Sequence, residues 1–184
     1  DPDFDIDAVH RLVNEGMVPY VQTYACLSGN FASTGSPECF SEAWIRSGNR
    51  GAIAHIASSV PSYWTEDDTL ERRVFDCMFD SSFFWVMGGF NRAKLLYYRQ
   101  MGPGPMTRMY FEMYNLMGDG AIDIYSTEPR ELTVSHPALL RLGTVPVTVQ
   151  VEDRSGPVQG ALVAITASRD TAVFAAGYTD GAGR

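Results

Sequence analysis

The chain has 184 residues, 45% of them hydrophobic, which is enough for one domain, or one and a fraction, with a buried core. A formal net charge of −8 gives a surface that repels phosphate backbones, which argues against nucleic acid as a partner. No apolar run is long enough to span a bilayer, and no signal peptide opens the sequence. Both ends look interrupted, so we expect a longer parent protein whose location these absences do not indicate.

The cysteines Cys26, Cys39 and Cys77 are few and widely spaced, unlike a disulfide framework or a zinc site. At least one free thiol is therefore expected. Cys39 and Cys77 have aromatic neighbours on predicted helix faces, and we interpret both as packing residues.

The first part of the chain contains two candidate strands. Residues 7–14 predict a short helix or turn. Residues 17–24 are mostly apolar and rich in β-formers, so they predict a buried parallel strand that begins after Pro19, because proline cannot donate to a strand ladder. The small side chains of residues 51–58 predict a second buried strand.

Two helix starts are recognisable near these strands. Residues 36–38, Ser-Pro-Glu, combine an N-cap serine with a first-turn proline, and they predict a helix through Ile45. Thr65 is predicted as the N-cap of a second helix. Its buried stripe is expected to be Leu70, Val74 and Met78.

Further helices are predicted over residues 90–99 and 107–116, followed by a short strand over residues 121–125. The pair Gly88-Gly89 is interpreted as the beginning of a helix after a break near residues 80–82, because no phosphate-loop or dinucleotide motif follows it. Strands alternating with helices make this part of the chain α/β.

The pattern changes after Ser126, where no helix-length periodicity remains. Short alternating segments separated by turn residues predict an all-β sandwich that is incomplete at its C-terminus. The predicted strands cover residues 132–134, 145–151, 161–167 and 172–178.

The most informative stretch is V-Q-T-Y-A-C-L-S-G-N-F at residues 21–31. The apolar run stops at Cys26 and turn-forming residues follow at once, as when a strand delivers a thiol to the edge of a sheet. Gly29 would let backbone amides face a substrate. A nucleophilic cysteine needs exposure and donors for a developing oxyanion. The alternative is a core thiol, because free cysteines are among the most buried residues.

Five blocks, in order, resemble the catalytic domain of the gingipain-like cysteine peptidases. They are Y-A-C-L-S-G-N-F, C-F-S-E-A-W-I-R, G-A-I-A-H-I-A-S-S, the tryptophan Trp64 and Y-N-L-M-G-D-G-A-I. The resemblance implies an α/β fold, a caspase-like three-layer αβα sandwich present in part, and then an incomplete immunoglobulin-like β-sandwich. The two domains would cover residues 1–127 and 128–184.

The resemblance implies a cysteine endopeptidase with Cys26 as nucleophile. The amide of Cys26 and the turn containing Gly29 would contribute to the oxyanion hole, and Trp64 would line the pocket for the residue before the scissile bond. The family's G-D-P element is Gly-Asp-Gly at residues 118–120 here, a departure that loosens one turn and is not expected to affect the chemistry.

The family's general base is a histidine of an H-G pair well before the cysteine, and counting back from Cys26 passes the start of the chain. The catalytic histidine is therefore expected upstream. His10 is not followed by glycine and is expected to be structural, His55 to be partly buried and hydrogen-bonded, and His136 receives no role. Residues 66–68, Glu-Asp-Asp, are interpreted as acids favoured at a helix N-terminus; the alternative is an acidic pocket for a basic substrate side chain.

The resemblance also implies a secreted or cell-surface bacterial hydrolase whose partner is a protein or peptide substrate. No cofactor is expected for the chemistry; the resemblance allows structural calcium, although no loop has calcium-ligand spacing. Two alternatives remain: an inactive peptidase-like scaffold that binds partners or cell-surface polymers, and a different α/β thiol enzyme such as an acyltransferase or amidase. Cleavage specificity and oligomeric state are not indicated by the sequence.

Overall fold

The structure is a computed structural model that describes residues 4–80, 85–125, 128–139, 146–167 and 170–184. The chain divides into two compact units, Asp1–Ser126 and Thr127–Arg184. In the described residues the first unit combines helices with a sheet, whereas the second contains only strands and loops.

The first unit is built on a three-stranded sheet of order β1-β2-β3. The central strand β2 (Ala54–Ser58) pairs in parallel with β1 (Tyr20–Gln22) and antiparallel with β3 (Tyr114–Gly118). Every residue of β2 is buried, which explains its small side chains, since helices cover both faces. β1 begins directly after Pro19, as predicted.

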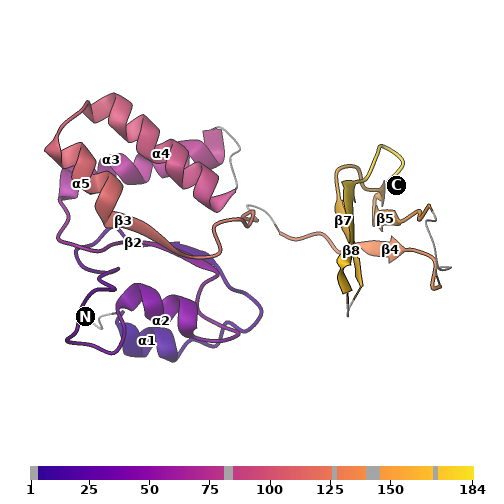
Figure 1. Ribbon diagram of the computed structural model, residues 1–184, viewed down its shortest axis with the longest axis horizontal. Helices are drawn as coiled ribbons and strands as arrows, with labels where there is room; N and C mark the ends of the chain where they lie inside the picture. The colour runs from indigo at the N-terminus through magenta and orange to yellow at the C-terminus, as the bar shows by residue number, and fades with distance from the viewer. Residues whose placement is uncertain (1–3, 81–84, 126–127, 140–145, 168–169) are drawn as a thin grey trace. The chain divides into compact units, whose positions relative to one another are not determined.

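Three helices cover one face of the sheet (Figure 1). They are α3 (Trp64–Phe75), which continues into the π-helical segment η1 (Asp76–Asp80), then α4 (Val86–Met101) and α5 (Pro105–Met113). The predicted stripe of α3 is confirmed, because Leu70, Val74 and Met78 are all buried.

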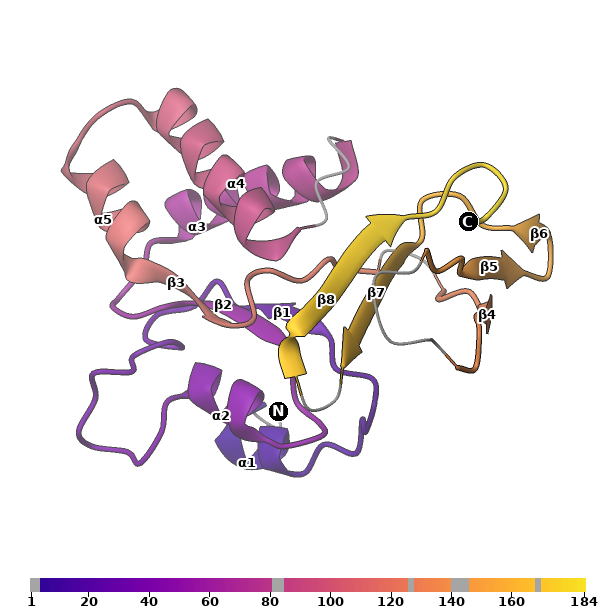
Figure 2. The same cartoon turned by 45° about the vertical axis from the view of Figure 1, so that its right-hand side comes forward.

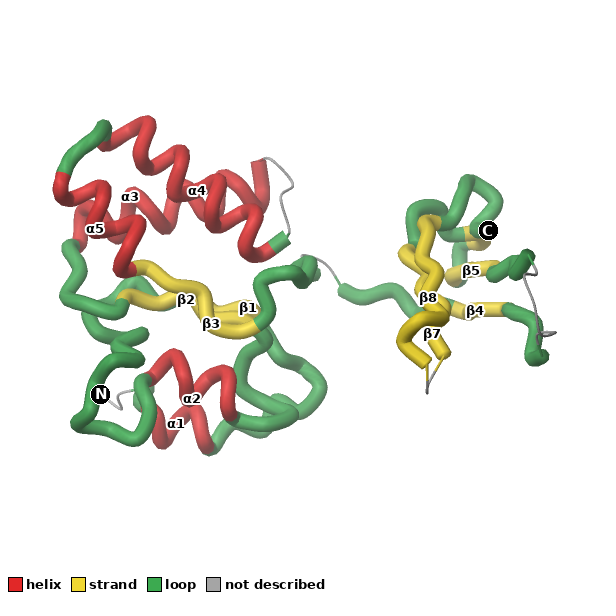
Figure 3. Tube along the Cα trace, in the orientation of Figure 1, coloured by secondary structure: helices red, strands yellow, loops and turns green. Residues whose placement is uncertain are grey.

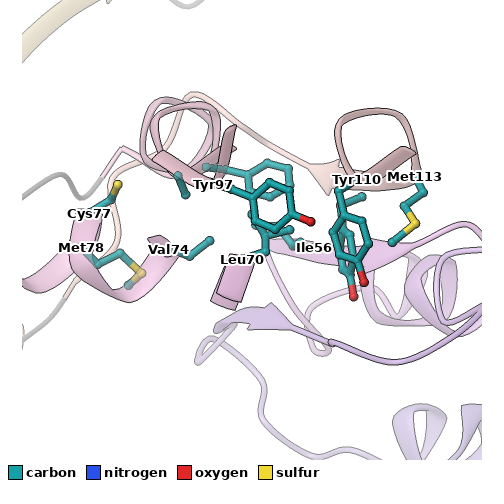
Figure 4. Packing of buried hydrophobic residues seen from close by; sticks show 11 residues of the cluster. Ile56, Leu70, Val74, Cys77, Met78, Tyr97, Tyr110 and Met113 are labelled. Carbon is teal, nitrogen blue, oxygen red and sulfur yellow. The ribbon is translucent and has the colours of Figure 1, made fainter. Parts of the chain in front are cut away.

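The larger core cluster lies under these helices (Figure 4). Ile56 of β2 packs there with the α3 stripe and with aromatic rings of α4 and α5. The rings of Tyr97 and Tyr110 stack with centroids 5.3 Å apart. These contacts fix α5, and with it the Tyr110 hydroxyl, against α3.

The opposite face of the sheet is covered by α1 (Ile6–His10) and α2 (Phe40–Arg46), an arrangement visible in both Figure 1 and Figure 2. A smaller core cluster of Val9, Ala43, Trp44 and Ala52 fills this side. The sheet therefore lies between two helical layers.

Two helix starts differ from the predicted ones. Residues 36–38 form no helix; α2 begins at Phe40 with Cys39 as N-cap residue. The Glu42 carboxylate accepts a hydrogen bond from the Cys39 N–H at 2.7 Å, and this contact replaces the cap expected from serine. α3 begins at Trp64, so that Thr65 lies within its first turn.

Tertiary pairing changes the later elements. α4 starts at Val86 and runs through both glycines at positions 88 and 89. The predicted helix over residues 107–116 is wrong in its last turn, because residues 114–118 pair with β2 instead. In place of a strand over residues 121–125, Asp123 makes a single β-bridge with Trp85. Residues 81 and 82, part of the predicted break, lie outside the described residues.

The second unit contains two small sheets. One joins β4 (Thr133–Ser135), β5 (Gln150–Asp153) and β6 (Gly156–Pro157), and the other is the hairpin of β7 (Leu162–Ala167) and β8 (Asp170–Tyr178). These strands overlap all the predicted ones, although Val145 lies outside the described residues. Among the described helices of the whole chain, none combines the length and apolar character needed to cross a bilayer.

Candidate active site

Cys26 lies in the turn after β1, at the end of the sheet where β1 and its parallel neighbour β2 both finish. The segment from β1 to α2 is a long loop (Figure 3), and Cys26 is exposed in it. The next residue, Leu27, has a φ of 60°, a left-handed conformation that costs a non-glycine residue about 1–2 kcal/mol. The turn thus presents the thiol to solvent rather than burying it in the core.

The thiol faces Ser62, in the loop between β2 and α3. The Ser62 N–H donates to Cys26 Sγ at 3.3 Å, and the Ser62 carbonyl oxygen lies 3.5 Å from the same sulfur. The two loops are joined again where the Leu27 N–H donates to the Val60 carbonyl oxygen. The sulfur is therefore held between the two loops, in contact with both the backbone N–H and the backbone carbonyl group of Ser62.

Gly29 is buried, and it holds the cysteine turn close to β2. A Cβ at this position would lie 2.9 Å from the Ala57 Cβ and 3.2 Å from the Ala57 carbonyl carbon. The Gly29 N–H donates to the Ser58 carbonyl oxygen at 2.8 Å, so this amide is already occupied. Gly29 therefore packs tightly against β2 with its own amide bonded, so a donor from this turn to a ligand would be another amide.

The Cys26 amide has no acceptor in the described part of the chain, and the same holds for the Ser28 amide of this turn. An unpaired N–H beside the nucleophile is the group that an oxyanion hole requires. Trp64 begins α3 two residues after Ser62, and its side chain is 90% exposed, which leaves the indole available to a ligand.

A buried carboxylate lies behind Ser62. Asp67 accepts hydrogen bonds from the hydroxyls of Ser62 at 2.6 Å, Tyr110 at 2.9 Å and Tyr114 at 2.6 Å. The pKa of the Tyr110 and Tyr114 hydroxyls lies well above the ordinary value for tyrosine. Burial is the main cause, and the hydrogen bonds to Asp67 add to it. Both phenols are therefore hydrogen-bond donors at physiological pH.

These contacts of Asp67 are not predicted from the sequence, in which the residue is interpreted as an acid favoured at a helix N-terminus. The acidic pattern at residues 66–68 did predict a helix start, and Glu66 and Asp67 do lie in the first turn of α3. Only the tertiary structure brings α5 and β3 to the same carboxylate, because Tyr110 and Tyr114 lie more than forty residues further along the chain.

Within the described part of the first unit, neither His10 nor His55 has Cys26 among its hydrogen-bond or ion-pair partners. His55 is hydrogen-bonded as predicted, with its ring nitrogens 2.8 Å from the hydroxyls of Thr23 and Ser41, and it is fully rather than partly buried. Burial lowers the pKa of His55 to about 4, so the ring is neutral at physiological pH. His10 Nε2 lies 2.8 Å from a carboxylate oxygen of Glu38.

Cys39 and Cys77 are buried, which confirms their interpretation as packing residues. Burial raises the pKa of both thiols. Within the described ranges, no cluster of three or more His, Cys, Asp or Glu side chains is arranged to hold a metal ion.

Comparisons with known proteins bear on the family and the fold of the chain. The model of the family described as "Peptidase family C25" matches residues 2–125, whereas no curated protein sequence matches the chain. The crystal structure of the Arg-specific cysteine proteinase gingipain R is similar, with a TM-score of 0.75, 18% sequence identity and coverage of 96% of this chain. The complex of the pro- and mature domains of RgpB from Porphyromonas gingivalis has a TM-score of 0.71 and 18% sequence identity, over 93% of this chain. A structure described only as a protease has a TM-score of 0.72 and 21% sequence identity, over 97% of this chain.

The chain spans only 40–42% of the length of these solved structures. At such low identities the structural likeness establishes a shared fold, here a mixed α/β fold like that of gingipain. The family model, in contrast, matches well over half of the chain. The chain therefore belongs to peptidase family C25, the gingipain-like cysteine peptidases.

Proposed function

We propose that the chain is the nucleophile-bearing part of a cysteine endopeptidase, with Cys26 as the nucleophile. The observation that carries the proposal is the exposed Cys26 thiol at the sheet edge, within 3.3 Å of the Ser62 N–H and next to a free backbone amide. Membership of family C25 supports a peptide substrate. The exposed Trp64, two residues beyond Ser62, supports an aromatic wall for the side chain before the scissile bond.

In the proposed reaction the Cys26 thiolate attacks the scissile carbonyl carbon, and the Cys26 N–H donates to the resulting oxyanion. The C–N bond then breaks as an imidazolium gives its proton to the leaving amine, which leaves an acyl thioester on Cys26. Water attacks the thioester with the imidazole as base, and the products are a carboxylate and the regenerated thiol. Neither metal nor cofactor has a step in this sequence, and structural calcium remains a family-based expectation.

We propose that the imidazole comes from outside these 184 residues. Two observations support this: His55 is committed to Thr23 and Ser41 in the core, and His10 contacts Glu38. The solved structures of similar fold have more than half of their length beyond the matched part. The 184-residue chain alone should therefore be inert, and thiol-dependent peptide turnover by it would contradict the proposal.

The decisive experiment compares peptide cleavage by the longest natural form of the protein and by its Cys26→Ala variant. Removal of the nucleophile should lower kcat by roughly 10³-fold or more. Cys39→Ala is the matched control, because it removes a buried thiol that has no proposed role. Equal cleavage by the wild type and Cys26→Ala would refute the assignment. Labelling of Cys26 by a peptidyl electrophile but not by a small acyl donor would separate a peptidase from an acyltransferase or amidase.

We also propose a fold for each of the two units and a cellular location for the protein. The sheet between two helical layers supports a caspase-like domain, and the strands of the second unit support an immunoglobulin-like sandwich, with domains at residues 1–127 and 128–184. Family membership supports a secreted or cell-surface protein. The rival proposal is a catalytically inactive scaffold. It would be favoured if every longer form of the protein, extended beyond these 184 residues, fails to cleave peptides.

A further inference from the structure

The thiol of Cys26 is held by a loop that is itself anchored from two sides. Ser62 supplies the N–H that faces Sγ, and the next residue, Tyr63, continues the same short segment into α3. Ser62 and Tyr63 lie outside any strand or helix, directly before α3, so side chains that bind them contribute to their position alongside the bond from the Asp67 N–H to the Tyr63 carbonyl oxygen.

The first anchor is Asp67. The Ser62 hydroxyl has one proton, and its oxygen lies 2.6 Å from Asp67 Oδ2 but 3.8 Å from Cys26 Sγ. A carboxylate is the stronger and closer acceptor, so the hydroxyl proton is directed at Asp67. This bond fixes the Ser62 side chain away from the sulfur and leaves the backbone N–H as the donor to Cys26.

The second anchor is Tyr110. Its hydroxyl oxygen accepts a hydrogen bond from the Tyr63 N–H at 2.9 Å, and it lies 2.9 Å from both Asp67 Oδ1 and the Tyr63 carbonyl oxygen. The Ser62–Tyr63 segment is thus bound through the Ser62 side chain and through the Tyr63 backbone, whose carbonyl oxygen also accepts a hydrogen bond from the Asp67 N–H at 2.8 Å. These bonds lead to residues that are buried in the core of α3 and α5.

Stability alone does not explain a buried carboxylate here. Asp67 exposes 8% of its surface and, among the described residues, forms no ion pair; three hydroxyls satisfy it. Burying a carboxylate is costly, and replacing a buried charge by apolar groups is often neutral or stabilising. What the carboxylate does provide is a fixed direction for the Ser62 side chain.

From these contacts we propose that Asp67 and Tyr110 are positioning residues for the Cys26 thiol, acting through Ser62 and Tyr63. The inference rests on the proposed function, in which Cys26 is the nucleophile. Loss of either anchor lets the Ser62 N–H move away from the sulfur, so that Cys26 becomes a weaker nucleophile while the substrate-binding surface is retained.

The test measures alkylation of Cys26 by iodoacetamide in the 184-residue chain, followed by peptide mass spectrometry. Ser62→Ala and Tyr110→Phe each remove one anchor without changing the charge. Both should slow alkylation of Cys26 by roughly three- to tenfold, as expected for a lost hydrogen bond near a charged group. Ser62→Thr keeps the hydroxyl and should restore the rate. Thermal unfolding of each variant confirms that it is folded.

Tyr97→Phe is the matched control. The Tyr97 ring stacks on Tyr110 in the same core, but within the described part of the chain its buried hydroxyl has no hydrogen-bond partner. In the Tyr97→Phe variant, the rate of Cys26 alkylation should lie within about twofold of the wild-type rate. Folded Ser62→Ala and Tyr110→Phe variants that alkylate as fast as Tyr97→Phe would overturn the inference.

Peptide cleavage by the longest natural form gives an independent readout. Loss of positioning should lower kcat in Ser62→Ala and Tyr110→Phe and leave KM within about twofold. A rise in KM alone would assign the network to substrate binding and overturn the inference. If Cys26→Ala abolishes cleavage but Ser62→Ala and Tyr110→Phe cleave like the wild type, the positioning role is refuted and the proposed function stands. If Cys26→Ala still cleaves, the proposed function itself is refuted.

Discussion

Gly29 and Ala57 are in such close contact that no side chain fits between the cysteine turn and the central strand. An added Cβ on Gly29 would lie 2.9 Å from the Ala57 Cβ and 3.3 Å from its carbonyl oxygen. The contact is reinforced by the bond from the Gly29 N–H to the Ser58 carbonyl oxygen. The contact between Gly29 and Ala57 fixes the distance between the cysteine turn and β2, and thereby the position of Cys26 at the sheet edge.

Gly29→Ala is therefore expected to lower the free energy of unfolding by about 1–3 kcal/mol, because the extra methyl group has to displace the backbone of β2 or of the turn. Chemical denaturation measures the change. Gly35→Ala is the matched control in the same loop, since the nearest atom to its added Cβ is the Ser33 hydroxyl at 3.8 Å. Equal stability of the two variants would contradict the tight contact.

The cysteines should differ sharply in reactivity. Cys26 is exposed, whereas Cys39 and Cys77 are buried and burial raises the pKa of both. Iodoacetamide near neutral pH should modify Cys26 in the folded chain and all three cysteines after denaturation, which peptide mass spectrometry can count. Modification of Cys77 before Cys26 in folded protein would show that the turn does not present the thiol.

Acid should weaken the fold through His55. Its pKa falls from 6.5 to about 4 on folding because burial penalises the charged ring. The unfolded chain then binds more protons between these two values, so this contribution is complete above pH 6.5 and is lost as the pH falls towards 4. The loss amounts to about 3 kcal/mol at most.

The measurement is the free energy of unfolding from urea titrations at several pH values. His55→Asn cannot titrate in this range, so its stability should fall less steeply between pH 6.5 and 4 than that of the wild type. Carboxylates contribute equally to both proteins, and the difference isolates His55. Parallel pH profiles would mean that His55 is not buried as a neutral ring.

Trp64 should matter for substrates and not for folding. With 90% of its surface exposed, Trp64→Ala should change the free energy of unfolding by less than about 0.5 kcal/mol. If the indole lines the substrate pocket, KM for peptides should rise several-fold in the longest natural form. Leu95→Ala, an exposed apolar residue on α4, is the control and should leave both quantities unchanged. An unchanged KM in Trp64→Ala would exclude the pocket role.

The amino-acid pattern by itself determined the local features of this chain. Apolar spacing predicted the α3 stripe, small side chains predicted β2, and the abrupt end of an apolar run at Cys26 predicted an exposed thiol after a strand. These signals are local, because each depends on periodicity or on the residues that follow within one turn. The resemblance to the gingipain-like peptidases could be recognised for the same reason, because each block is a short local motif.

Only the tertiary structure decided which groups meet the thiol. The helix predicted over residues 107–116 gives way to β3 from Tyr114, because pairing with β2 outweighs helix propensity there. That change, with the packing of α5, brings Tyr110 and Tyr114 to Asp67, and Asp67 in turn to Ser62. Hydrogen bonds between residues more than forty positions apart leave no periodic trace in a sequence, so the network behind Cys26 becomes visible only once the chain is folded.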